Sequence, residues 1–149
     1  MTKSRFRSLV FPLIVIPLGG LLMMALTFLL FAILYNLLET LFFPNNPFAF
    51  PAGFLRMAYA AALVILYLLL LRTKLADLLK AIILTGPLAA GIIAVGHALY
   101  ELPAVSIPAM FAVTALCGVL LYRFKKPWIY TYAGAIGALV ALVYAWPRP

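Results

Sequence analysis

Five polar residues that lie within or at the ends of the hydrophobic segments of this chain are the candidates for binding or catalysis. They are spread over three hydrophobic segments and comprise Asn36, Glu39, Arg56, His97 and Glu101. His97 and Glu101 are four residues apart, so on a helix they share one face. Ionisable groups in apolar surroundings are costly, and they are therefore usually paired or functional. Arg56 is the strongest candidate, with Glu39 and Glu101 as its expected partners.

These residues have three alternative roles. They could form a polar pocket that grips a lipid headgroup, an ion or an anionic substrate. Alternatively, Arg56 could extend to the headgroups or form a structural ion pair, with His97 merely at the interface. A metal or catalytic site is the weakest interpretation, because one histidine and two separated glutamates are a poor ligand set. We predict no cofactor, since phosphate-binding glycine loops, CxxC, nucleophile-elbow and HExxH motifs are absent from the sequence.

The composition predicts an integral membrane protein. Of 149 residues, 68% are hydrophobic and 9% charged, whereas soluble chains have roughly 45–50% apolar and about 25% charged residues. No stretch is long and polar enough for a soluble domain, so we expect one all-α, polytopic helical bundle over residues 1–149, with the lipid bilayer as its partner. Cys117 is the single cysteine, which excludes an intrachain disulfide and indicates a small packing residue.

Apolar runs separated by charged, proline-rich and glycine-containing segments predict five transmembrane helices. They cover approximately residues 18–42, 52–71, 79–100, 104–122 and 127–146, near the ~20 residues needed to cross a hydrocarbon core. The run from Leu9 to Phe43 is too long for one straight span. We expect Pro12, Pro17 and the following glycine pair to separate a kinked or interfacial N-terminal piece from the first span.

Two of these segments carry small residues at every fourth position. The stripes are Gly86, Ala90, Ala94 and Ala98 in the third segment, and Ala133, Gly137, Ala141 and Ala145 in the fifth. Small side chains on one face let another backbone approach closely. We therefore expect these two helices to dock along their stripes, with the other helices packed around them. Alternatively, one stripe faces another membrane subunit or a second copy of the chain.

The basic residues predict the orientation. With five spans, one side receives Lys3, Arg5, Arg7, Arg72, Lys74, Lys80, Arg123, Lys125 and Lys126, and the other receives Arg56 and Arg148. The positive-inside rule then places the N-terminus in the cytoplasm and the C-terminus outside a cell membrane. The net charge of +8 thus indicates topology rather than nucleic-acid binding. Within residues 72–80 we expect an interfacial helical turn, with Asp77 in a solvated ion pair with Lys74 or Lys80.

These features favour two functional hypotheses. The first is a non-catalytic subunit or assembly partner of a larger membrane complex, because packing signals are abundant and catalytic motifs are missing. The second is a small transporter, channel or lipid-handling protein that uses an outward-facing cluster around Arg56. Five helices enclose little pore, so this second function would favour a homo-oligomer. An embedded enzyme is the third and least supported possibility.

Overall fold

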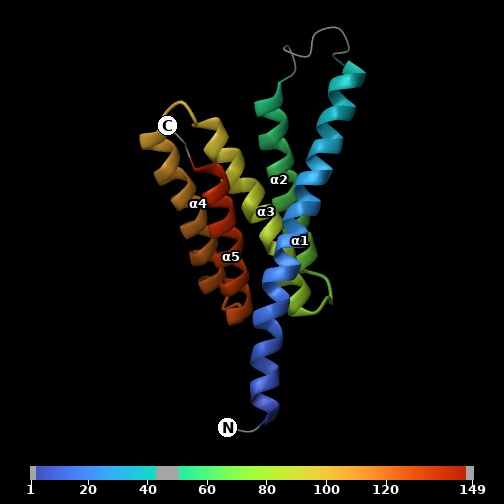
Figure 1. Ribbon diagram of the computed structural model, residues 1–149, viewed down its shortest axis with the longest axis vertical. Helices are drawn as coiled ribbons and strands as arrows, with labels where there is room; N and C mark the ends of the chain where they lie inside the picture. The colour runs from blue at the N-terminus through green and yellow to red at the C-terminus, as the bar shows by residue number, and fades with distance from the viewer. Residues whose placement is uncertain (1–2, 43–50, 147–149) are drawn as a thin grey trace.

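The structure is a bundle of five helices. The computed structural model describes residues 3–42 and 51–146, with side chains from Val10 onward. The helices are α1 (Lys3–Phe42), α2 (Ala52–Leu71), α3 (Asp77–Ala98), α4 (Pro103–Arg123) and α5 (Trp128–Ala145) (Figure 1). Each is long and apolar enough to cross a membrane. Together with many exposed leucine and valine side chains, this suggests a multi-pass membrane location.

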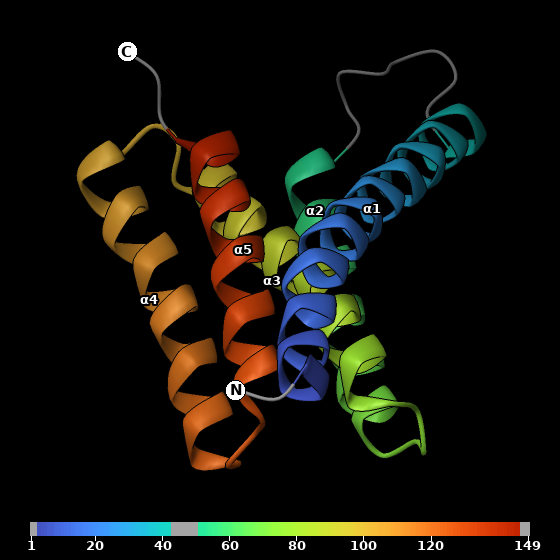
Figure 2. The same cartoon turned by 60° about the horizontal axis from the view of Figure 1, so that its bottom comes forward.

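α3 is the central helix. It contacts each of the other four helices, and Figure 2 shows it with α5 on one side and with α1 and α2 on the other. Most of its apolar stretch is buried, whereas α2 and α4 bury little of theirs. Small residues explain this position, because a helix with neighbours on every side must let several backbones approach it.

The most extensive contact in the bundle is between α3 and α5, the two helices that carry the small-residue stripes. The whole α5 stripe is buried: Ala133, Gly137, Ala141 and Ala145. A Cβ atom added to Gly137 would lie 3.2 Å from the Cα of Thr85, so the two backbones touch at this point. Ala89 and Ile92 of α3 pack in the same apolar cluster as Ala141.

The α3 stripe differs from its expected direction, because it does not face α5. A Cβ atom on Gly86 would lie 2.6 Å from Thr27 Oγ1 of α1. Ala90 and Ala94 instead pack against Ala60 of α2, and Ala98 is exposed. A helix has 3.6 residues per turn, so each four-residue step rotates the stripe by about 40°. Over three steps the stripe therefore passes from one neighbouring helix to the next.

α1 is one unbroken helix, so the expected separation of an N-terminal piece near residue 18 is not found. It runs through Pro12 and Pro17, and the apolar stretch Val10–Phe42 includes both prolines. Pro17 cannot donate to the carbonyl of Leu13, but the hydroxyl of Tyr132 on α5 donates to that carbonyl at 3.3 Å. Such replacement of a lost backbone bond is what lets prolines remain inside membrane helices.

The segment between α2 and α3 also differs from its prediction. Residues 72–76 form a turn rather than an interfacial helix, and α3 begins at Asp77. The buried Lys80 Nζ donates to the carbonyls of Leu71 at 3.1 Å and Thr73 at 2.7 Å. It therefore neutralises the negative end of α2. Asp77 Oδ1 accepts a hydrogen bond from Tyr130 at 2.9 Å, which replaces the expected local ion pair.

Candidate functional site

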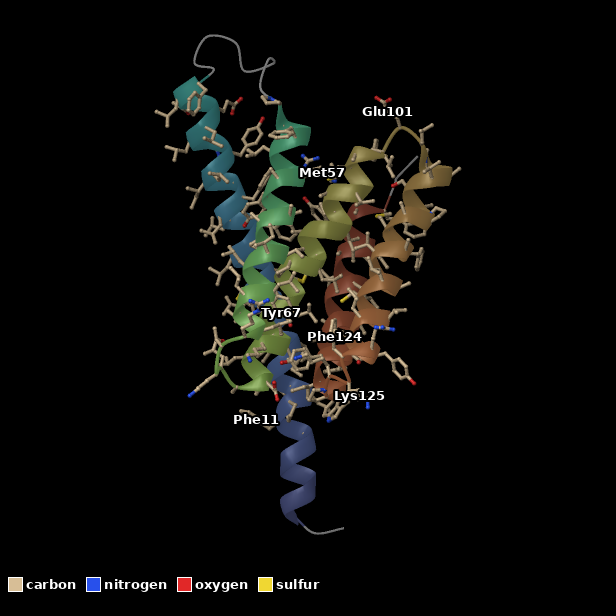
Figure 3. All side chains as sticks on the ribbon, turned by 180° about the vertical axis from the view of Figure 1, so that it is seen from behind. Phe11, Met57, Tyr67, Glu101, Phe124 and Lys125 are labelled. Atoms are coloured by element: carbon tan, nitrogen blue, oxygen red, sulfur yellow. The ribbon has the colours of Figure 1, made fainter. Side chains whose placement is uncertain are left out.

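Arg56 and His97 line the same cavity. Its volume is about 120 Å³, and its walls come from four helices: Phe28, Phe31, Arg56, Tyr59, Ala90, Ile93, His97 and Tyr144. Figure 3 labels Met57, the neighbour of Arg56, at the end of the bundle opposite the start of α1. The cavity thus lies away from the 72–76 and 124–127 turns and their basic residues.

Aromatic contacts between helices hold the cavity walls in place. Phe28 of α1 stacks on Tyr144 of α5 with ring centroids 5.9 Å apart. Phe31 of α1 meets Tyr59 of α2 at 5.3 Å, and the Tyr59 hydroxyl donates to the Thr27 carbonyl at 2.7 Å. Paired rings and a hydrogen bond across helices add to the energy of simple apolar burial, so this end of the bundle has a defined shape.

Arg56 and His97, the two basic residues in the cavity lining, are suited to binding an anion. Arg56 is half-buried and His97 is exposed. The Nδ1 of His97 lies 3.1 Å from the carbonyl of Ile93, and because a carbonyl only accepts, Nδ1 carries the proton. The other ring nitrogen, Nε2, is then the one left for a ligand. The guanidinium of Arg56 can donate two parallel hydrogen bonds to a phosphate or carboxylate.

The other three predicted residues lie outside the cavity. Asn36 Nδ2 donates to the Ala32 carbonyl on its own helix at 2.7 Å. Glu39 is half-buried near the end of α1, and Glu101 is exposed in the turn after α3 (Figure 3). Neither glutamate lines the cavity. The expected pairing of Arg56 with Glu39 or Glu101 has no counterpart among the contacts of the described residues.

Sequence reasoning missed the aromatic walls. Phe28 and Phe31 are three residues apart on α1, a spacing that places them on one helix face. That signal was available, but nothing local to the sequence indicates that Tyr59 and Tyr144 meet them. Among the residues that the structure describes, no three His, Cys, Asp or Glu side chains come together as a metal site.

Comparison with protein-family models, with curated proteins and with solved structures gave no match. The chemistry of the cavity is therefore the basis for assigning a function. Its defining property is a half-buried cation among aromatic side chains, with no carboxylate in the cavity wall.

Proposed function

We propose that this is a lipid-handling membrane protein that binds an anionic headgroup in the Arg56–His97 cavity. This proposal rests on the observation that Arg56 lines an aromatic cavity whose walls contain no acidic side chain. A half-buried charge in apolar surroundings without a counter-charge is unfavourable, so a ligand anion would stabilise this arrangement.

The cavity size restricts the ligand. Pockets for drug-sized molecules have volumes of roughly 300–1,000 Å³, whereas this cavity has about 120 Å³. Only a phosphate- or carboxylate-sized group fits, so the remainder of a larger ligand must lie outside the cavity. A phospholipid meets this requirement because its acyl chains can remain in the bilayer. Free inorganic phosphate has the same chemistry and is the alternative source.

The proposal includes an orientation. The turns at 72–76 and 124–127 lie at the same end of the bundle as the start of α1 (Figure 1), in support of one basic, cytoplasmic face. The cavity is at the other end and would face outward, on the same side as the end of α5. A cell membrane is the proposed location.

The test is a binding measurement on the purified protein. Short-chain phosphatidylglycerol should raise the thermal unfolding midpoint, and short-chain phosphatidylcholine should not. Arg56→Gln should remove this shift, whereas the matched control Arg72→Gln, an exposed cation at the other end, should retain it. An equal shift with inorganic phosphate would identify a free anion as the ligand. Retention of the shift in Arg56→Gln would contradict the proposed function.

A second candidate function is that of a non-catalytic subunit, and the loose packing of α4 favours it. Only Ser106 and Met110 of this helix are buried. An apolar groove of about 550 Å³ lies beside it, and its lining includes Leu139 and Val143 of α5 and Trp146, which follows that helix. This function predicts a complex of fixed stoichiometry in mild detergent that Leu139→Trp disrupts. If the wild-type protein in mild detergent has the mass of a single chain with nothing bound to it, the subunit function is excluded.

A further inference from the structure

A second, mostly apolar groove opens on the side of the bundle, between α2 and α4. α3 forms its floor, and Figure 3 shows α3 between these two helices. The groove has a volume of about 230 Å³, and its lining includes Val64, Tyr67, Gly91, Leu116 and Lys126. Lys126 of this groove belongs to the 124–127 turn, far from Arg56, and none of the residues that line the groove also lines the proposed headgroup cavity.

Tyr67 contributes an unpartnered hydroxyl to this groove. The residue is 7% exposed, and its buried Oη has no hydrogen-bond partner. Its neighbours in the core include Leu84 and Ala133, which are apolar. A buried polar atom without a partner is unfavourable. Tyr130 is also in this core cluster, and the Tyr67 Oη is itself closed off from solvent. An acceptor oxygen in the groove therefore reaches this hydroxyl once the neighbouring side chains shift.

Gly91 keeps the floor of the groove open. A Cβ atom added there would meet no atom within 4 Å, whereas one on Gly86, Gly96 or Gly137 would press against a neighbouring helix. Glycine inside a helix is less stable than alanine. Contact with another helix compensates that cost at the other three positions, but not at Gly91. An occupant of the groove would provide the missing contact.

The mouth of the groove is basic. Lys126 lines it, with its Nζ 5.4 Å from the centroid of the Tyr130 ring. Arg123 and Lys125 are on the same turn. Lys125 has a φ of 48°, and the Lys126 amide donates to the Leu121 carbonyl at 3.1 Å. Together these two features define a common type of helix ending, in which the position of Lys125 is usually glycine. A cation therefore occupies a position where the backbone favours glycine.

We propose that this groove binds one acyl chain of an anionic phospholipid. The chain lies along the apolar floor at Gly91, the phosphate lies against Lys126, and an ester oxygen accepts the hydrogen bond of Tyr67. A transmembrane helix is a worse fit, because with side chains it is about 10–12 Å across and brings no anion to the basic mouth. Basic pockets between membrane helices are known to select anionic lipids.

The test is photo-cross-linking with phosphatidylglycerol that carries a diazirine on its acyl chain, using full-length protein in nanodiscs. Peptides from α2 and α4 should be labelled. Gly91→Leu, which fills the floor, should reduce labelling by about tenfold. The matched control Gly118→Leu, which also enters open space but does not line this groove, should not.

Three further measurements make the result decisive. Lys126→Gln should reduce labelling by phosphatidylglycerol by about fivefold, the effect of one basic residue near a membrane surface. A phosphatidylcholine probe should label weakly throughout. Arg56→Gln should leave the labelling of α4 peptides unchanged, which separates this site from the headgroup cavity, because no α4 residue lines that cavity. Equal labelling of the Gly91→Leu and Gly118→Leu proteins, or equal labelling by the two lipids, would overturn the proposal.

Discussion

α5 and α4 both pack against α3, but they do so in different ways. α5 buries an entire row of alanines and glycines, and Gly137 brings its backbone to that of Thr85. α4 buries only Ser106 and Met110 and is flanked by grooves. Lipid tails are as apolar as leucine, so membrane helices associate through close packing rather than through the hydrophobic effect. The α3–α5 pair is therefore the structural core, and the space around α4 is available for binding.

Of the variants that test this difference between α5 and α4, Gly137→Leu should lower the thermal stability most. Its side chain would start 3.2 Å from the Cα of Thr85, a backbone atom that cannot rotate away. Overpacking of this kind costs about 1–3 kcal/mol or more. The thermal unfolding midpoint in detergent should fall well below that of Gly118→Leu, the control on α4. Equal midpoints would mean that α5 is no more tightly packed than α4.

Tyr130→Phe should have the next largest effect. It removes the hydrogen bond from α5 to Asp77 at the start of α3, which has a length of 2.9 Å. Because the acceptor is charged but exposed, a loss of about 1–2 kcal/mol in the free energy of unfolding is expected. Chemical unfolding would measure it, with Tyr132→Phe as a control that removes a longer bond. If Tyr132→Phe lowers the free energy of unfolding more than Tyr130→Phe does, this ranking is refuted.

Ser106→Ala should cost less. The Ser106 hydroxyl donates to the Gly96 carbonyl at 3.3 Å and is buried, so it is the main polar anchor between α4 and α3. A neutral hydrogen bond contributes about 1 kcal/mol. The same unfolding assay should detect this loss, together with increased protease access to the 99–102 turn, which joins the two helices next to this bond. No change in either measurement would show that α4 is held by apolar contacts alone.

Gly118→Ala should have the smallest effect and the opposite sign. Nothing lies within 4 Å of the added methyl group, and alanine is favoured over glycine in a helix by about 1 kcal/mol. The unfolding midpoint should stay equal or rise slightly. A clear fall would reveal a close neighbour at this face of α4, such as a second subunit.

The sequence predicted the helical architecture better than its details, for physical reasons. Apolar length is a local property, and it placed the five helices. The small-residue spacing named α3 and α5, which do share the most extensive contact, but the α3 stripe itself faces α1 and α2. The expected break in α1 did not occur because the partner of the Leu13 carbonyl is Tyr132, far away in the sequence. The role of Lys80 was missed for a related reason, since its carbonyl partners belong to the preceding helix and turn.

The cavity was predictable in part. Arg56 and His97 were identified because polar residues are rare and costly in apolar segments. Their aromatic surroundings and the absence of Glu39 and Glu101 from the cavity wall depend on how helices rotate about their axes. A sequence pattern gives helix faces, but it does not say which neighbour each face meets. The same limit explains why the α3 stripe was directed toward the wrong helix.

The central position of α3 also determines the order of assembly. α1 and α2 touch each other little, whereas each has extensive contact with α3. We therefore expect α1 and α2 to need α3 before they pack stably, even though Phe31, Tyr59 and the Thr27 carbonyl join them directly. We expect α5 to complete the core last. Premature termination before residue 77 should thus leave a hairpin that membrane quality control recognises as unassembled.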